Sequence, residues 1–197
     1  MTDPRRPDYY ARRMADVQIY LAGVVNNQTA PKLIEVVNER VGKGARSVLI
    51  AISSGGGNIY WGVTAYNFLR GLGITVITHN LGQVDSVAGV LYCAGEERLC
   101  VPEGRFLIHG VQTTFGGTNP TLAEKDLRST LASLEQDRDT IASILATRTG
   151  KPLADVRADM LKERILTAAD AQDYGFVTKI TPDVFDPSQE IVQILLP

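Results

Sequence analysis

A serine, a histidine and a glycine-rich loop are the residues of this chain whose types and positions suggest catalysis. Ser86 follows the apolar segment 74–79 and directly precedes a run of small and apolar residues, 87–94. His109 ends a second apolar segment 23 residues later, and the loop Ser53-Ser54-Gly55-Gly56-Gly57 lies upstream of both. A hydroxyl at the start of a helix, a histidine base and a glycine loop are the parts of a serine nucleophile site with an oxyanion hole.

A purely structural interpretation of the same residues is also open. Serine is a favoured residue immediately before a helix, so Ser86 can be a helix cap. Histidine is often partly or fully buried, so His109 can be a core residue whose polar atoms are satisfied. The two interpretations differ in whether the serine hydroxyl and the histidine face one site.

The hydrophobic pattern predicts alternating strands and helices that would position these residues. Strands are expected at residues 17–23, 47–53, 74–79, 98–101, 105–109 and 176–180. Helices are expected at residues 29–41, 59–72, 87–94, 120–148, 153–161 and 168–174. Such alternation is typical of an α/β fold with a mainly parallel sheet, whose sites lie in loops at the carboxyl ends of strands. Residues 53–57 and 80–86 are expected to be such loops.

Two segments of the sequence could contact a neighbouring subunit. The expected helix 120–148 carries apolar residues at a four-three spacing: Leu127, Leu131, Leu134, Ile141 and Leu145. This stripe indicates packing on another helix, often from a neighbouring subunit, or else an ordinary core helix. The tail 181–197, with three prolines and the apolar run 191–196, is expected to drape on a neighbouring subunit or to lack order.

Composition excludes several classes of function. The chain has 197 residues, 44% of them hydrophobic, which is enough for one domain with its own core. A net charge of −2 indicates neither a nucleic-acid partner nor an anionic membrane surface. The sequence has no run long enough to span a bilayer and no apolar stretch of a signal peptide near Met1, which predicts a cytoplasmic protein. Two cysteines and two histidines predict core thiols and no zinc site, and we expect no metal and no organic cofactor.

Further short motifs extend over most of the chain. They are Asp8-Tyr9-Tyr10, Ile19-Tyr20-Leu21-Ala22-Gly23, Gly82-Gln83 ahead of the serine, Ala94-Gly95, Ile108-His109, Thr149-Gly150 and Ala171-Gln172-Asp173-Tyr174-Gly175. With these motifs the chain, from Asp8 to Ile180, resembles the proteolytic subunit of the Clp protease, within the crotonase-like superfamily. The resemblance implies a ClpP/crotonase-like α/β fold, in which repeated β-β-α units form a superhelix and a long handle helix protrudes.

The resemblance also implies an activity and an assembly. It implies a serine endopeptidase that cleaves peptides or unfolded protein inside a homo-oligomer of two stacked heptameric rings. In this chain Ser86 matches the nucleophile, His109 the general base and Glu163 the third member of the triad. The backbone N–H groups of Gly57 and Val87 match the oxyanion donors. The residues expected to bind the substrate backbone are Gly56, Asn58, Ile59, Gly116 and Gly117.

The chain departs from the family pattern at a few positions. Glu163 stands where the family has an aspartate, and Gly55 stands where it has a proline. Asp85 replaces a small neutral residue beside the nucleophile, and we expect its side chain to point away from the site and to cap the following helix.

The resemblance also sets the expected domain organisation. We expect a short N-terminal segment with a helix at 1–18, a peptidase domain at 19–180 whose handle covers about 113–148, and a tail at 181–197. Only seven residues precede Asp8, fewer than in the family, so docking to an AAA+ unfoldase is left open.

Two other functions remain open from the sequence. One is a catalytically silent ClpP-like ring subunit, which the glutamate at position 163 and the carboxylate at position 85 favour. The other is a crotonase-like enzyme that acts on an acyl thioester, because that chemistry uses the same pair of backbone N–H donors. The paired serine and histidine favour the peptidase.

Overall fold

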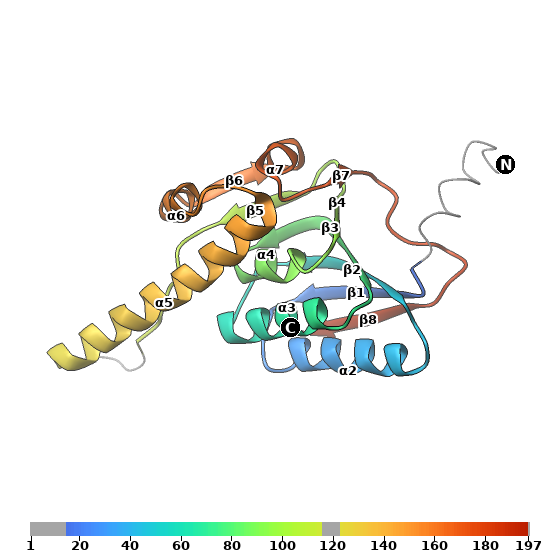
Figure 1. Cartoon of the computed structure of the whole chain (residues 1–197), viewed down its shortest axis with the longest axis horizontal. Coiled ribbons are helices and arrows are strands. Elements are labelled where there is room, and N and C mark those ends of the chain that lie inside the picture. The colour runs from blue at the N-terminus through green and yellow to red at the C-terminus, as the bar shows by residue number, and fades with distance from the viewer. Residues whose placement is uncertain (1–14, 116–122, 197) are drawn as a thin grey trace.

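A sheet of parallel strands forms the centre of the fold (Figure 1). The computed structural model describes residues 15–115 and 123–196. Within them the strand order is β6-β5-β3-β2-β1-β8, and only β5 and β6 pair antiparallel. The strands of this path are β1 (Val17–Gly23), β2 (Ser47–Ser54), β3 (Thr75–Asp85), β5 (Arg105–Ile108), β6 (Arg164–Thr167) and β8 (Ile191–Leu196). A branch pairs β4 (Glu97–Cys100) with β3, and β7 (Lys179–Ile180) with β4.

Helices cover one face of this sheet. The helices α2 (Thr29–Gly42), α3 (Ile59–Gly71) and α4 (Val87–Tyr92) pack against the strands and share one apolar core with them (Figure 1). Ile50 and Ile52 of β2 point into this core, whereas Leu49 belongs to a smaller cluster with Ile77 and Leu99. Phe185 packs against that smaller cluster. Both faces of β2 are therefore covered, which explains why its sequence is a continuous apolar run.

Strand β3 is longer than the sequence predicts, so the expected loop at 80–86 is wrong. The strand pairs with β4 as far as Asn80 and with β5 from Gln83 to Asp85. Asn80 bridges the change of partner, because its Nδ2 donates to the Arg105 carbonyl at 2.9 Å and its Oδ1 accepts from Gly82 N–H at 2.8 Å. A polar residue that looks like a strand end therefore holds the strand together where it changes neighbours.

The C-terminal segment also corrects an expectation. Residues 191–196 form β8, which pairs parallel with β1 from Gln18↔Ile191 to Gly23↔Leu196. The expectation that this run drapes on a neighbour or lacks order is therefore wrong. The expected strand at 176–180 is reduced to Lys179–Ile180, and β6 was not expected at all. The sheet thus extends from near the start of the described chain to near its end.

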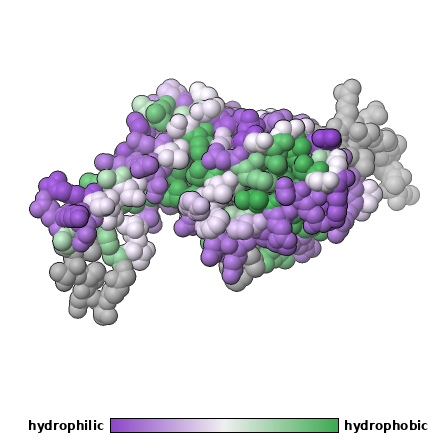
Figure 2. Space-filling model, turned by 60° about the horizontal axis from the view of Figure 1, so that its bottom comes forward, coloured by the Kyte–Doolittle hydropathy of each residue, from purple (hydrophilic) through white to green (hydrophobic). Residues whose placement is uncertain are grey.

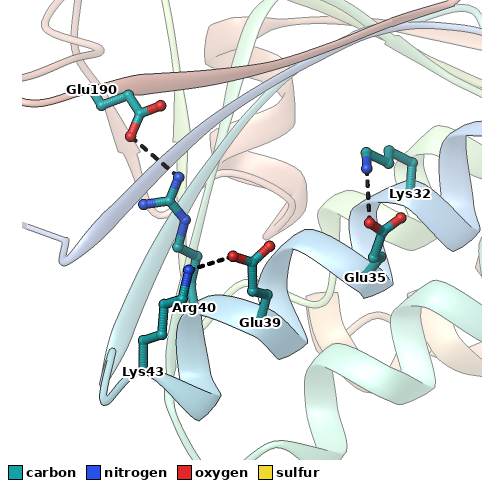
Figure 3. A network of polar contacts seen from close by, with 6 residues as sticks. All are labelled: Lys32, Glu35, Glu39, Arg40, Lys43 and Glu190. Atoms are coloured by element: carbon teal, nitrogen blue, oxygen red, sulfur yellow. Dashed lines mark hydrogen bonds and ion pairs between the residues drawn. The ribbon is translucent and has the colours of Figure 1, made fainter.

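An ion pair links Glu190, the residue directly before β8, to helix α2 (Figure 3). Arg40, in the last turn of α2, donates from Nη2 to Glu190 Oε2 at 3.2 Å. The neighbouring pairs Lys32–Glu35 and Lys43–Glu39 lie within α2 or at its end. All these side chains are substantially exposed, so each pair contributes little to stability on its own.

The long helix α5 (Glu124–Thr149) projects from the body of the molecule (Figure 1). Ala123 has an extended backbone, so the helix begins at Glu124 rather than at residue 120. Of the predicted stripe, Ile141 and Leu145 are buried in the core, whereas Leu127 and Leu131 are exposed. The projecting end is mainly hydrophilic, while hydrophobic side chains gather over the middle of the same face (Figure 2). The core interpretation of the stripe therefore holds for the C-terminal half of the helix, and packing of the exposed half on another subunit stays a prediction.

The remaining helices follow the sequence prediction. Helix α6 (Leu153–Leu161) has the predicted bounds, and Thr167 caps α7 (Ala168–Tyr174) by accepting a hydrogen bond from Asp170 N–H at 3.2 Å. Among the helices of the described residues, none combines the length and the apolarity needed to cross a membrane.

Candidate active site

Ser86 lies in the turn between β3 and α4, in an unusual backbone conformation. Its φ is 56° and its ψ is −133°, and Glu163 is the other non-glycine residue with positive φ in the described chain. Such a conformation costs about 1–3 kcal/mol and persists only where the surroundings enforce it. Ser86 N–H donates to the Leu107 carbonyl at 2.9 Å, which ties the turn to β5. A strained turn between a strand and a helix is also where α/β-hydrolases hold a nucleophilic serine.

The serine hydroxyl makes no hydrogen bond that caps α4. The interpretation of Ser86 as a helix cap is therefore wrong, although the residue occupies the cap position. Ser86 lines a cavity of about 260 Å³ together with Gly57 and His109. The hydroxyl thus belongs to a cavity wall and not to the helix end.

His109 follows β5 and lines the same cavity as Ser86. Its side chain is only partly buried, and it makes no hydrogen bond to another described residue. The histidine that fits the description of a core residue is His79, which is fully buried and has its Nε2 3.3 Å from the Thr181 carbonyl oxygen. The interpretation of His109 as a satisfied core histidine is therefore wrong.

The glycine loop packs directly against the serine. A Cβ atom added to Gly56, where φ is 98°, would lie 2.6 Å from Ser86 Cβ and 2.9 Å from the Asp85 carbonyl oxygen. A Cβ atom added to Gly57, where φ is 147°, would lie 2.3 Å from the Val25 carbonyl oxygen. Only glycine allows the chain to pass so close at these two positions.

The expected oxyanion donors flank the serine. Val87 follows Ser86 and Gly57 ends the glycine loop, and neither backbone N–H donates a hydrogen bond to another described residue. Both groups are thus available to a developing negative charge in the cavity.

The expected substrate-binding residues are only partly brought to the cavity. Ile59 lines it, and Asn58 instead caps α3 by accepting a hydrogen bond from Trp61 N–H at 3.2 Å. Gly56 is buried beneath the serine. Gly116 and Gly117 lie outside the described residues.

Glu163 lies opposite His109 in the register of β5 and β6, but its side chain makes no hydrogen bond or ion pair with the histidine. Strands β5 and β6 pair Ile108 with Arg164, so His109 and Glu163 come next on the two strands. The Glu163 side chain is exposed, its φ is 51°, and it makes no hydrogen bond or ion pair with another described residue. The structure therefore brings Ser86 and His109 to one cavity without joining a carboxylate to the histidine.

Asp159, the acid one helical turn before Glu163 in the chain, is engaged elsewhere. Its carboxylate accepts from Arg164 Nη1 at 3.1 and 3.2 Å and from the Tyr174 hydroxyl at 3.0 Å. Burial and this hydrogen bond raise the pKa of Tyr174 above its ordinary range. Asp159 thus serves the packing of α6 on α7.

Asp85 forms a polar contact that the sequence analysis missed. The residue is only 4% exposed, and its Oδ2 accepts from Arg105 Nη2 at 2.9 Å and from Gln83 Nε2 at 2.6 Å. The expectation that Asp85 caps α4 is therefore wrong. The expected loop at 80–86 hid this contact: Gln83 and Asp85 share one face of β3, and Arg105 opens the paired strand β5.

Many of the other wall residues of the cavity are apolar, with Ile59, Phe106, Ile141, Leu145 and Phe176 among them, and Gln112 is polar. Burial raises the pKa of both thiols, Cys93 and Cys100, to about 12, so they are unreactive near neutral pH. Within residues 15–115 and 123–196, no group of three or more His, Cys, Asp or Glu side chains could hold a metal ion.

Comparison with known proteins decides the family. A family model described as Clp protease matches residues 2–183. The chain belongs to the Clp protease family. The ATP-dependent Clp protease proteolytic subunit 1 of Leifsonia xyli subsp. xyli is 30% identical over 181 residues, covering 89% of this chain and 88% of that protein.

Relatives from another organism and a solved structure agree with the Clp assignment. From Rhodococcus jostii, proteolytic subunit 1 is 33% identical over 137 residues, covering 68% of this chain and 60% of the relative. Subunit 3 of the same organism is 28% identical over 165 residues, with coverages of 82% and 79%. A mutant of ClpP1 from Listeria monocytogenes has a TM-score of 0.76 at 21% identity, covering 84% of this chain and 91% of that chain. The expected ClpP-like α/β fold is confirmed.

Proposed function

We propose that this chain is a serine endopeptidase of the Clp proteolytic-subunit type. The observation that carries the proposal is the setting of Ser86. The residue lies in a strained turn, and its hydroxyl makes no hydrogen bond that caps α4. It lines the same cavity as His109 and packs against the glycine loop. Such strain is consistent with a functional turn and is not needed for a simple helix cap.

The proposed reaction uses only groups of this chain and water. Ser86 Oγ attacks the carbonyl carbon of a bound peptide while His109 takes the hydroxyl proton. The carbonyl oxygen becomes an oxyanion that accepts hydrogen bonds from the N–H groups of Gly57 and Val87. The C–N bond then breaks as His109 donates its proton to the leaving amine. Water, deprotonated by the same histidine, hydrolyses the acyl-enzyme.

We assign Glu163 the role of orienting His109. The register of β5 and β6 puts the two backbones next to each other, so a change of the glutamate side-chain rotamer is the smallest movement that could join them. A carboxylate bound to the second ring nitrogen would hold the tautomer and stabilise the imidazolium that forms. The longer side chain of glutamate gives it reach from an exposed position.

The proposed assembly follows the family. Leu127 and Leu131 are exposed on the projecting half of α5, where a second copy of the chain could cover them. We propose a homo-oligomer of stacked heptameric rings that encloses the sites and takes peptides or unfolded protein as substrate. A cytoplasmic location stays a prediction from the sequence, and docking of an AAA+ unfoldase stays open.

An active-site probe tests the proposal. A fluorophosphonate should label the oligomer at Ser86 alone, located by mass spectrometry of the modified peptide, and Ser86→Ala should abolish both labelling and peptide cleavage. Labelling that survives Ser86→Ala would contradict the assignment of the nucleophile.

A silent ring subunit is the second candidate, and the exposed, uncoupled carboxylate of Glu163 favours it. It predicts intact oligomers with no fluorophosphonate labelling at any pH. The two candidates therefore give opposite results in one experiment.

A further inference from the structure

A second hollow adjoins the cavity that contains Ser86. It encloses about 640 Å³ between α3 and α5, a volume in the range of small-molecule and side-chain binding sites. The two hollows share the wall residues Gly57, Ile59, Val111 and Gln112. A peptide held at Ser86 would therefore extend one of its neighbouring side chains into this hollow, which we call the α3–α5 groove.

The groove has more polar side chains in its wall than the cavity beside it. Its wall carries hydroxyl and amide side chains from both helices: Thr64, Asn67, Thr130, Ser133 and Thr140. Among the described wall residues, Asp137 is the one side chain that is charged at neutral pH, and none is a lysine or arginine. The groove thus has a negative charge with no fixed cation among its described wall residues.

Asp137 differs from its neighbour Asp139 in its partners. Asp139 accepts hydrogen bonds from Arg138 Nε and Arg157 Nε, both at 3.1 Å, and these cations hold its pKa below the ordinary value. Asp137 is partly buried in the groove wall and makes no hydrogen bond or ion pair with another described residue. The nearest cation in sequence, Arg138, is paired with Asp139. The Asp137 carboxylate therefore lines the groove without an ion pair to a described cation of the protein.

We propose that the α3–α5 groove is a subsite for a lysine or arginine side chain of the peptide substrate, with Asp137 as its counter-ion. The inference rests on the proposed peptidase function. An ammonium or guanidinium group would pair with the carboxylate and donate its remaining hydrogen bonds to the threonine and serine hydroxyl oxygens. Tyr60, a wall residue whose ring is 67% exposed, offers an aromatic face to the same cation.

Binding of paired peptides to the Ser86→Ala oligomer tests this subsite without relying on turnover. Fluorescent peptides that differ only in lysine or norleucine at one position, scanned across the sequence, are titrated by anisotropy. At one position the lysine peptide should bind about fivefold more tightly at low salt, the upper range for a partly exposed ion pair. The preference should vanish near 1 M salt, where the screening length is about 3 Å.

Two charge-matched variants locate the effect. Asp137→Asn should remove the lysine preference, whereas Glu135→Gln, which changes an exposed acid of the same helix outside the groove wall, should leave it unchanged. Equal binding of both peptides at every position, no binding of either, or equal loss in both variants would overturn the subsite. As a second readout, cleavage sites of the active protein in a peptide mixture should show lysine or arginine enriched at one position, again dependent on Asp137.

The outcome separates this inference from the proposed function. Fluorophosphonate labelling of Ser86 with no basic preference would overturn the subsite alone. Absence of labelling would overturn the peptidase, whatever the binding data show.

Discussion

Arg105 Nη2 donates to Asp85 Oδ2 at 2.9 Å, and Asp85 is the residue directly before Ser86. The contact joins the start of β5 to the end of β3, and the Ser86 N–H donates to the Leu107 carbonyl two residues further along β5. Asp85 Oδ1 is buried and has no hydrogen-bond partner in the described chain, so the carboxylate depends on Arg105 and Gln83 for its compensation. The strained turn of Ser86 is therefore supported by an ion pair that crosses between two strands.

Removing the arginine should expose this dependence. Arg105→Met leaves the Asp85 charge buried and less compensated, and we expect the free energy of unfolding to fall by about 2–3 kcal/mol, below the range for fully buried pairs because Arg105 is 44% exposed. Urea denaturation measures the loss. The double variant Arg105→Met with Asp85→Leu should recover part of it, and a double variant as unstable as the sum of the single ones would contradict the coupling.

The glycine loop offers a matched pair of substitutions. Gly56→Ala places a Cβ against Ser86 Cβ and should reduce fluorophosphonate labelling of Ser86 about a hundredfold, because the nucleophile or the loop must shift. A Cβ atom at Gly55 would lie 3.7 Å from its nearest atom, Gln83 Nε2, which is an ordinary contact. The Gly55→Ala variant should therefore be labelled at Ser86 at a rate within about twofold of that of the unchanged chain. Equal effects of the two alanines would show that the close approach to Ser86 is unimportant.

Glu163 can be tested as the orienting acid. Glu163→Gln should lower kcat for peptide cleavage by about 10²–10⁴, the range seen when a triad histidine loses its carboxylate. Asp155→Asn, which changes an exposed acid of α6, serves as the control and should leave kcat unchanged. A fully active Glu163→Gln would mean that the histidine works without this residue.

The buried thiols give a pH dependence with a definite sign. Folding raises the pKa of Cys93 and Cys100 from 9.0 to about 12, so between these values the unfolded chain has lost protons that the folded chain keeps. Stability should therefore fall as the pH rises from about 9 toward 12. Replacing both cysteines with alanine should flatten this part of the stability curve. In agreement, iodoacetamide at pH 8 should modify both cysteines only after unfolding.

Strand β8 should contribute to stability through one of its faces. Ile194 is 3% exposed, and Ile194→Ala should cost about 2–4 kcal/mol of unfolding free energy. Leu195 is 52% exposed, and Leu195→Ala should cost less than about 1 kcal/mol. Thermal or urea unfolding of the two variants compares them directly. Similar small losses would mean that β8 is not part of the cooperative core.

The sequence pattern predicted an element correctly wherever residues close in the chain determine that element. The bounds of β1 and α6 and the cap at Thr167 agree with the sequence prediction because hydrophobic periodicity and capping involve residues close in the chain. The meeting of Ser86 and His109 at one cavity was also foreseeable, since both were expected to follow strands of a mainly parallel sheet. The Clp protease motifs supplied the roles that periodicity does not.

What only the tertiary structure decided involves residues far apart in the chain. β8 is a strand because β1 offers its edge, β3 continues beyond His79 because Asn80 bridges two partners, and Asp85 is engaged because Arg105 opens the adjacent strand. The sequence by itself determined the alternating α/β pattern and the candidate serine, histidine and glycine loop. The fold decided the backbone strain at Ser86 and left the Glu163 carboxylate without a hydrogen bond to His109, because both depend on which strand ends meet.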